Sequence, residues 1–366
     1  MQTYLVGGAV RDKLLGFEPH ERDWVVVGAT PGHMQEQGFQ QVGKDFPVFL
    51  HPDTGEEYAL ARTERKSGSG YKGFDVHFDP SVTLADDLIR RDLTINAIAE
   101  DEEGHLIDPF DGRRDIQQRV LRHVSEAFTE DPLRVLRIAR FWARFHCLGF
   151  SIAEQTKELL QQMVTSGELR HLTPERVWKE WEKSLTTPEP HKFLELLNQL
   201  NATEDVLPQL KVSQQQLTLL AKMSRASDDT ELRFASVFIG QPDDFNLSVF
   251  CQRLAIPNRY RHAAELAFQY QLLLSKAKLS SSEYFDLLQA IDYWRRPHRL
   301  TQFLTLRFTL FLAPEKGFIE AVKTAAAEAA SVGASEIVAK GFSGKAIGAE
   351  LARQRRQVFE QKLAAS

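Results

Sequence analysis

Two glycines and two acidic residues near the start of the chain have the types and spacing to bind a metal-bound nucleotide. Gly7 and Gly8 follow one short apolar stretch, and Glu21 and Asp23 open a second one. Paired glycines ahead of a helix expose backbone N–H groups, which favour phosphate. Neighbouring carboxylates repel each other unless a cation neutralises them. The pattern therefore predicts a phosphate site beside a Mg²⁺ site.

Strand, turn, helix and strand must follow in that order to position these residues. We expect a strand over residues 3–6, a helix after Gly8 and a strand over residues 21–27. Alternate residues of a strand share a face, so Glu21 and Asp23 should lie together. A glycine pair alone is typical of many turns, and an acidic pair of many solvated edges. Their adjacency in this order favours the functional interpretation.

A predicted hairpin offers a third carboxylate. Strand-length runs over residues 46–51 and 57–62 flank a turn sequence at 52–55. Glu57 shares a face with small residues, which makes it a candidate ligand, and a surface position on an edge strand is the alternative. The segment 62–80 is rich in glycine, serine and cations. We expect it to form a mobile loop over the site.

Two charged motifs follow the predicted hairpin. In the first, Arg91 precedes Asp92 and Asn96 follows four residues later. A guanidinium matches phosphate oxygens, and the Asp and Asn could hold ribose hydroxyls or orient the arginines. A charge pair at a helix N-terminus is the alternative.

The second motif places Asp131 and Arg134 three residues apart in a helix predicted over residues 131–145. Residues at this spacing lie on one side of a helix. Donors beside acceptors match the edges of cytosine and adenine, whereas guanine and uracil carry the reverse pattern. The pair could therefore select bases, and a modest surface ion pair is the alternative.

These motifs resemble those of class II tRNA nucleotidyltransferases, the CCA-adding enzymes and their poly(A) polymerase relatives. The resemblance implies an α+β head of polymerase-β-like nucleotidyltransferase type, followed by an all-α neck, body and tail. It implies addition of C, C and A to the 3′ end of tRNA from CTP and ATP, with Mg²⁺ as cofactor. The implied domains are a head, a neck for base recognition, a body and a tRNA-binding tail over residues 1–125, 126–190, 191–310 and 311–366.

The resemblance also implies the site residues. Asp23 and Glu21 would be catalytic and would bind the metal, although the family has aspartate where Glu21 stands. The implied nucleotide-binding residues are Gly8, Arg11, Arg91, Asp92, Asn96, Asp131, Arg134 and Arg137. Longer relatives carry a His-Asp phosphohydrolase motif where this chain has Ile239 and Gly240. We therefore expect a form that lacks that domain.

Helical patterns continue from residue 131 almost to the C-terminus. Segments 153–165, 173–185 and 190–200 have helix length and capping signals, and Ser343 is the expected cap of a last helix. Arginines cluster at residues 134–144 and 353–356. A solvated face is the alternative interpretation of either cluster.

Composition limits the class of protein. The chain has 366 residues, 43% of them hydrophobic, enough for several domains. Two cysteines form no disulfide framework, which favours a reducing cytoplasm, and no apolar run approaches the ~20 residues of a membrane helix. A net charge of -5 argues against nonspecific coating of nucleic acid. The expected partners are ATP, CTP and the acceptor stem and T arm of tRNA, with no membrane and no required protein partner.

Three alternatives stay open. Poly(A) polymerases share the motifs, although residues 43–47 are nearer the CCA-adding type. An A-adding specialist is not excluded, whereas the intact segment 62–80 disfavours a CC-adding one. A catalytically silent RNA-binding factor has Glu21 as its only support.

Overall fold

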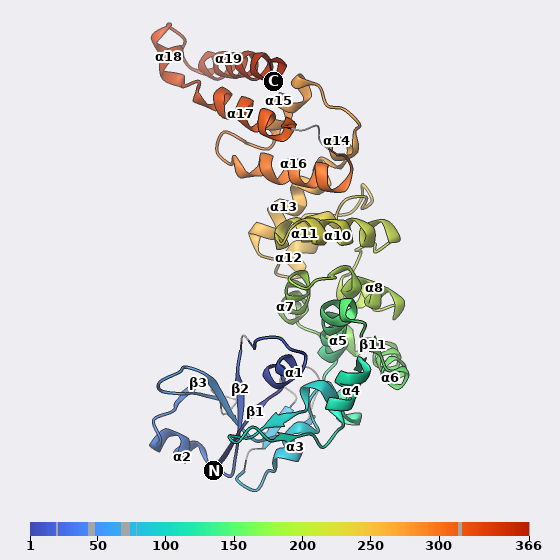
Figure 1. The fold of residues 1–366 in the computed structure, drawn as a ribbon. Helices are drawn as coiled ribbons and strands as arrows, with labels where there is room; N and C mark the ends of the chain where they lie inside the picture. Colours follow the sequence, from blue (N-terminus) through green and yellow to red (C-terminus); the bar gives the residue numbers. More distant parts are fainter. Residues whose placement is uncertain (20, 43–47, 67–73, 78, 314–316, 366) are drawn as a thin grey trace. The chain divides into compact units, whose positions relative to one another are not determined.

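The computed structural model describes residues 1–19, 21–42, 48–66, 74–77, 79–313 and 317–365. The chain divides into two compact units, Met1–Pro208 and Gln209–Ser366. The first unit contains a β-sheet followed by helices, and the second is helical throughout its described part (Figure 1). The predicted fold class is confirmed. The division into four domains stays a prediction.

A seven-stranded sheet in the order β3-β4-β5-β2-β1-β8-β9 forms the head. Its middle strands have two apolar faces, because Val6 and Val25 pack on one side and Val26 on the other. The strands are β1 (Gln2–Val6), β2 (Asp23–Val27), β3 (Gln40–Val42), β4 (Val48–Leu50), β5 (Glu57–Leu60), β8 (Ala99–Glu100) and β9 (Leu106–Ile107).

Short helices cover both faces of this sheet. Leu88 of α3 (Leu84–Leu88) packs with Val25, and Met34 of α2 (Pro31–Glu36) packs with Val26. Thr83 begins α3 with a capping box that includes Asp86. Two further helices, α1 (Gly8–Leu14) and α4 (Gly112–Gln118), complete the head.

The predicted hairpin is confirmed by the antiparallel pairing of β4 with β5. The segment predicted as a loop begins and ends in two further strands, β6 (Thr63–Lys66) and β7 (Phe74–His77), which pair with each other. Residues 67–73 and 78 lie outside the described residues, so closure of this segment over the site stays a prediction. Residues 43–47, which favour the CCA-adding type, also lie outside them.

The helices that follow the head pack around α5, which contacts α7 and α8. Apolar residues of α5 recur every three or four positions, and Val135, Ile138 and Ala139 are buried. The helices are α5 (Leu133–Phe145), α6 (Glu154–Thr165), α7 (Pro174–Leu185), α8 (His191–Gln199) and α9 (Thr203–Val206). The short strands β10 (Val120–Leu121) and β11 (Ser151–Ile152) pair beside them.

The predicted helix over residues 131–145 begins two residues late, at Leu133. Asp131 has an extended backbone, with φ -115° and ψ 106°. The cause is Pro132, because a proline disfavours helical geometry at the residue before it. Asp131 therefore lies ahead of the helix that carries Arg134.

The second unit has its own apolar core, which includes Phe285, Phe303 and Phe359. Its helices are α10 (Gln214–Ala226), α11 (Thr230–Ser236), α12 (Leu247–Arg253), α13 (Asn258–Gln269), α14 (Gln271–Ser275), α15 (Ser281–Ala290), α16 (His298–Leu310), α17 (Phe318–Ser331), α18 (Ala334–Ala339) and α19 (Lys345–Ala364). The prediction that Ser343 caps the last helix is wrong, because Gly344 occupies the cap position with φ 56°. In the described part of the chain, no helix has the length and apolar character needed to cross a membrane.

Gly112 allows α4 to pack against the 3₁₀ turn η1 (Thr94–Asn96). A Cβ at this position would lie 2.2 Å from the carbonyl oxygen of Thr94 and 2.8 Å from Cγ1 of Ile98. We expect Gly112→Ala to lower the free energy of unfolding of the first unit by about 3 kcal/mol, because backbone must move. Urea unfolding of the whole chain measures this loss.

Gly32→Ala is the matched control, because Gly32 also lies in a helix of the head. The nearest atom to its added Cβ is Oγ1 of Thr30, at 3.9 Å. We expect no loss of stability from Gly32→Ala. Equal unfolding curves for the two variants would contradict the close packing at Gly112.

Candidate active site

The sheet edge where β1 ends brings together the glycine turn and the predicted carboxylates. Asp23 pairs in register with Val6 on one side and with Glu57 on the other. Gly7 N–H donates to the carbonyl oxygen of Ile98 at 3.3 Å. Register partners in a sheet share a face, so Asp23 and Glu57 lie on the side of the sheet that packs against α3. Glu57 therefore lies where a third carboxylate would.

Glu21 lies beside Asp23 but outside the strand. The strand begins two residues later than predicted, because β1 ends at Val6 and offers no strand residue to pair with residues 21 and 22. Burial raises the pKa of Asp23, Arg91 opposes this rise, and repulsion from Glu21 adds to it. The two carboxylates are therefore close enough to repel each other, and their shared role at a metal stays a prediction.

Glycine is required at position 7 for two reasons. Gly7 has φ 70°, a conformation that side chains rarely adopt. A Cβ on it would also lie 2.8 Å from Nη1 of Arg91. The Arg91 guanidinium is held there by Asp87 at 3.2 Å and by the carbonyl oxygen of Asn96 at 3.4 Å. The Arg91 guanidinium therefore lies next to the glycine turn.

Arg11 is buried, with 3% of its surface exposed. Its Nε and Nη2 donate to Oδ1 of Asp12 at 2.9 and 2.8 Å, and Nη1 donates to Oδ1 of Asn96. The guanidinium also lies 5.4 Å from the ring of Phe141 and 5.1 Å from that of Phe145. Burial lowers the pKa of Arg11. In this arrangement Arg11 joins α1 to η1 and α5, and its role in seating phosphate stays a prediction.

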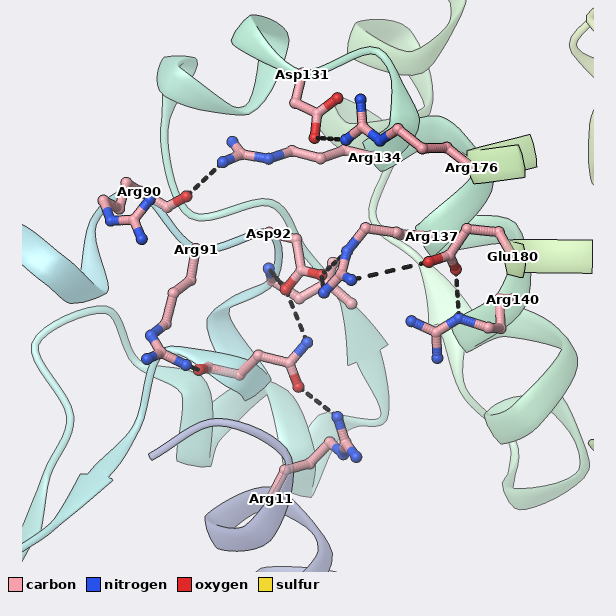
Figure 2. A network of polar contacts seen from close by, with 12 residues as sticks. Arg11, Arg90, Arg91, Asp92, Asp131, Arg134, Arg137, Arg140, Arg176 and Glu180 are labelled. Carbon is pink, nitrogen blue, oxygen red and sulfur yellow. Dashed lines mark hydrogen bonds and ion pairs between the residues drawn. The ribbon is translucent and has the colours of Figure 1, made fainter. Parts of the chain in front are cut away.

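Asp92 is the centre of the network, with 5% of its surface exposed (Figure 2). It accepts hydrogen bonds from Asn96 Nδ2, Leu93 N and Arg137 Nε, each at 2.8 Å. Burial opposes ionisation, but Arg137 and the bonds from Asn96 and Arg137 outweigh it and hold the pKa of Asp92 well below its usual range. Asp92 in turn raises the pKa of Arg137. Asp92 therefore orients Asn96 and Arg137.

Asp131 and Arg134 are each held by other groups. Arg134 donates to the carbonyl oxygens of Ala127 at 2.7 Å and Arg90 at 2.6 Å. Asp131 accepts a hydrogen bond from Arg176 Nη2 at 2.8 Å (Figure 2). Burial lowers the pKa of Arg134, while Asp92 and Asp131 oppose this shift. The ion pair that Asp131 makes is thus with α7 and not with Arg134.

Two residues of α7 that the motifs do not single out belong to this network. Arg176 holds Asp131, and Glu180 accepts from Arg140 Nε at 2.5 Å and lies 4.0 Å from Arg137 Nη1. Glu180 is only 5% exposed. A signal exists in the sequence, because these charged residues lie four apart on one side of a helix that also carries apolar Val177 and Trp181.

All the residues predicted for the site lie in the first unit, and its contacts bring them together. Arg11 bonds to Asn96, Asn96 to Asp92, and Asp92 to Arg137 (Figure 2). Arg91 donates to the carbonyl oxygen of Asn96, Arg134 donates to that of Arg90, and the Arg91 charge opposes the rise in the pKa of Asp23. That the sheet edge and the start of α5 form one nucleotide site stays a prediction.

The sheet edge carries carboxylates of the type that bind a divalent cation, but Glu21, Asp23 and Glu57 do not form a described group whose ligand atoms all lie within 4.8 Å of one another. Carboxylate oxygens are the ligands that Mg²⁺ prefers, and Asp23 is flanked by two other acids. Among the described residues, Asp101, Glu103 and His105 form a separate group whose ligand atoms lie within 4.8 Å of one another. That group follows β8, which runs antiparallel to β1 and therefore away from the glycine turn.

Replacing Asp92 should test the charge balance of the network. We expect Asp92→Asn to lower the free energy of unfolding at neutral pH by about 3 kcal/mol, because it leaves Arg137 without its carboxylate. The folded-state pKa of Asp92 is depressed, so its stabilisation is present above the unfolded pKa, about 4. The difference from wild type should shrink as pH falls below that value. Urea unfolding between pH 7 and pH 3 measures it.

Asp205→Asn is the control for this series. Asp205 accepts from Arg170 at 2.7 Å, and the Arg170 side chain is 71% exposed. Exposed pairs contribute under about 1 kcal/mol, so we expect a small change. A loss for Asp92→Asn no larger than this would remove Asp92 from the centre of the network.

Comparison with known proteins agrees with this geometry. Residues 3–122 match a family model described as the poly A polymerase head domain, and residues 149–213 match one described as a probable RNA and SrmB-binding site of polymerase A. The chain is 49% identical over 363 residues to a CCA-adding enzyme of Marinobacter nauticus, with 97% of each chain covered. It is 43% identical to a multifunctional CCA protein of Aliivibrio salmonicida, again with 97% of each covered.

Solved structures share the fold. A CCA-adding enzyme without ligand superposes with a TM-score of 0.74 at 24% identity, covering 100% of this chain and 90% of the other. The identity to the Marinobacter nauticus enzyme over nearly the whole length of both chains is decisive. The chain therefore belongs to the family of CCA-adding enzymes, the class II tRNA nucleotidyltransferases.

Proposed function

We infer that this chain adds C, C and A to the 3′ end of tRNA, with CTP and ATP as substrates and without a nucleic-acid template. The observation that carries the inference is the tie between Asp92 and Arg137. It fixes the turn next to the glycine and carboxylate edge against α5, whose first turn carries Arg134 and which follows Asp131, the two predicted base-reading residues. One site can then hold both ends of a nucleotide.

In the proposed reaction, the 3′-hydroxyl oxygen of tRNA bonds to the α-phosphorus, and the bond to pyrophosphate breaks. Gly8 and Arg11 would seat the triphosphate, and Arg91, which lies next to Gly7, would add a second guanidinium. Arg11 keeps Asn96 in place behind them. Positioning and charge stabilisation supply most of the catalysis in transfers of this kind.

Membership of this family implies a divalent metal. We propose that it is Mg²⁺ and that Asp23 and Glu21 hold it, with Glu57, the register partner of Asp23, as a candidate third ligand. A bound divalent ion would lower the pKa of the attacking hydroxyl and neutralise charge on pyrophosphate. Supporting this assignment, Asp23 already has a raised pKa, because burial and Glu21 disfavour its charge.

The proposed base readers are Asp131 and Arg134. A guanidinium has five N–H donors, so the two carbonyl bonds of Arg134 orient it and leave donors for a base. Asp131 is likewise fixed by Arg176 and by Leu133 N–H, and each of its oxygens has a further lone pair. Cytosine and adenine fit such an edge, whereas guanine and uracil would oppose donor to donor.

The tRNA partner would be gripped by its acceptor stem and T arm through shape and backbone, as double-helical RNA requires. Arginines of α19 have partners inside the second unit. Arg353 pairs with Glu350 and Arg356 with Asp286, while Arg355 lies 4.4 Å from the Trp294 ring. Their first role is therefore structural, and other groups would supply most phosphate contacts. The cytoplasm is the proposed compartment.

A primer assay tests the function. We expect the purified chain with Mg²⁺ to add C to tRNA ending before CCA, C after one C, and A after CC, and to reject UTP and GTP. Labelled nucleotides and gel analysis read each step. Addition of A alone would indicate an A-adding specialist, and repeated addition of A a poly(A) polymerase. Addition to no primer with Mg²⁺ or Mn²⁺ would leave an RNA-binding factor.

Two substitutions test the proposed metal ligands in the same assay. Asp23→Asn should lower kcat by at least 100-fold, because it removes a ligand charge. Glu21→Asp should keep or raise kcat, because it shortens the arm and keeps the charge. A collapse of activity in Glu21→Asp would show that Glu21 is not a metal ligand of the kind proposed.

Base selection has its own prediction. We expect Asp131→Ala or Arg134→Ala to lower the selectivity for CTP over UTP by at least tenfold, with a smaller change in triphosphate affinity. The measurement is kcat/KM for each nucleotide on tRNA ending before CCA. Arg170→Ala, an exposed arginine with a single acidic partner, is the control and should leave selectivity unchanged. Selectivity that survives in both site variants would remove them from base reading.

A further inference from the structure

Asp12 links α1 to α5 through an ion pair with Arg144. Its Oδ1 accepts two hydrogen bonds from Arg11, and its Oδ2 accepts one from Arg144 Nη2 at 2.9 Å. Asp12 is 8% exposed. The carboxylate therefore bridges the helix after the glycine turn and the end of α5.

The bridge is packed between aromatic rings. Arg11 lies over Phe141 and Phe145, and Arg144 lies 5.0 Å from the Phe145 ring. Two guanidinium groups and one carboxylate leave a surplus of positive charge, and the Arg144 charge lowers the pKa of Arg11. Without Asp12 the two arginines would face each other in a partly buried space. Such an arrangement is strongly unfavourable.

The bridge also sets the direction in which Arg11 points. With Nε and Nη2 fixed on Asp12, Nη1 reaches Oδ1 of Asn96. Asn96 then donates to Asp92, which holds Arg137. The two aspartates thus each pair with an arginine of α5, Asp92 with Arg137 and Asp12 with Arg144, two helical turns apart.

We propose that Asp12 and Arg144 are positioning residues that set the distance and angle between the triphosphate seat and the base-reading start of α5. Arg134 and Arg137 hold the first half of α5 against the head, through the carbonyl oxygen of Arg90 and through Asp92. The Asp12–Arg144 pair holds the end of the helix, about two turns further on, so that the helix cannot pivot about its start. A base can then be read only when its triphosphate lies on the glycine turn.

This proposal rests on the proposed function and is tested with intact chain and tRNA ending before CCA. In Asp12→Asn, an amide N–H₂ can replace the oxygen that faces Arg144, so that donor meets donor. We expect KM for CTP to rise and selectivity for CTP over UTP to fall, each about tenfold. Arg144→Gln alone should have a smaller effect, because Asp12 keeps Arg11.

The double variant Asp12→Asn with Arg144→Gln restores a neutral hydrogen bond, because the glutamine oxygen can accept from the asparagine amide. We expect it to recover at least half of the lost selectivity on a logarithmic scale, which measures coupling between the two positions. Additive losses in the double variant would overturn the proposal. Urea unfolding of each variant separates folding from selectivity, and normal KM and selectivity in a merely less stable Asp12→Asn would also overturn it.

Glu189→Gln is the matched control. Glu189 accepts from His146 Nδ1 at 2.7 Å, just beyond the end of α5, so Glu189→Gln also removes a carboxylate that bonds to this segment. It has no contact with α1 among the described residues. We expect its KM and selectivity to match wild type. Wild type that adds no nucleotide would instead refute the proposed function, independently of Asp12.

Discussion

A buried carboxylate must be matched by cations and hydrogen-bond donors, and Asp92 meets that requirement only if several elements come together. Its partners come from its own turn, from η1 and from α5. Burial would keep the group neutral, yet its pKa lies well below the usual range because Arg137 and the hydrogen bonds outweigh burial. The head and the first helices after it are therefore one structure at this point. Nucleotide binding across that junction requires such continuity.

The pairing register of the strands positions the glycine turn and the carboxylates of the predicted site. β1 ends at Val6, and Gly7 follows it with a positive φ that side chains rarely adopt and with Arg91 Nη1 close to where a Cβ would lie. The strand beside it begins at Asp23, and the next begins at Glu57. Acidic groups thus meet at this edge, and the Arg91 charge does not offset the burial of Asp23 and the repulsion from Glu21 that raise its pKa. This imbalance of charge is what makes the edge suitable for a cation.

Local sequence patterns predict the local structure of this chain, but they do not predict ion pairs between residues far apart in the sequence. The period of the strands and the turn residues are enough to predict the glycine turn, the hairpin whose second strand begins at Glu57, and the order of the helices. Pro132 explains why α5 begins late. A proline keeps the residue before it out of the helix, and the prediction of a helix from residue 131 did not apply this rule to Asp131. No spacing rule pairs Asp131 with Arg176, 45 residues away. Likewise the burial of Arg11 depends on two rings of α5 that meet it only after folding.

A protein surface that selects bases must hold its donors and acceptors still before the base arrives. Arg134 and Asp131 are held by hydrogen bonds to groups that are not substrate, two from the guanidinium and two to the carboxylate. Each group has more hydrogen-bonding capacity than these contacts use. The bonds that fix orientation and the bonds that read a base can therefore coexist, and no partner needs to be exchanged when a nucleotide binds. Discrimination between bases by these two proposed readers would then depend on geometry already present in the folded chain. A base whose hydrogen-bonding edge does not match is rejected most strongly when that geometry is fixed beforehand.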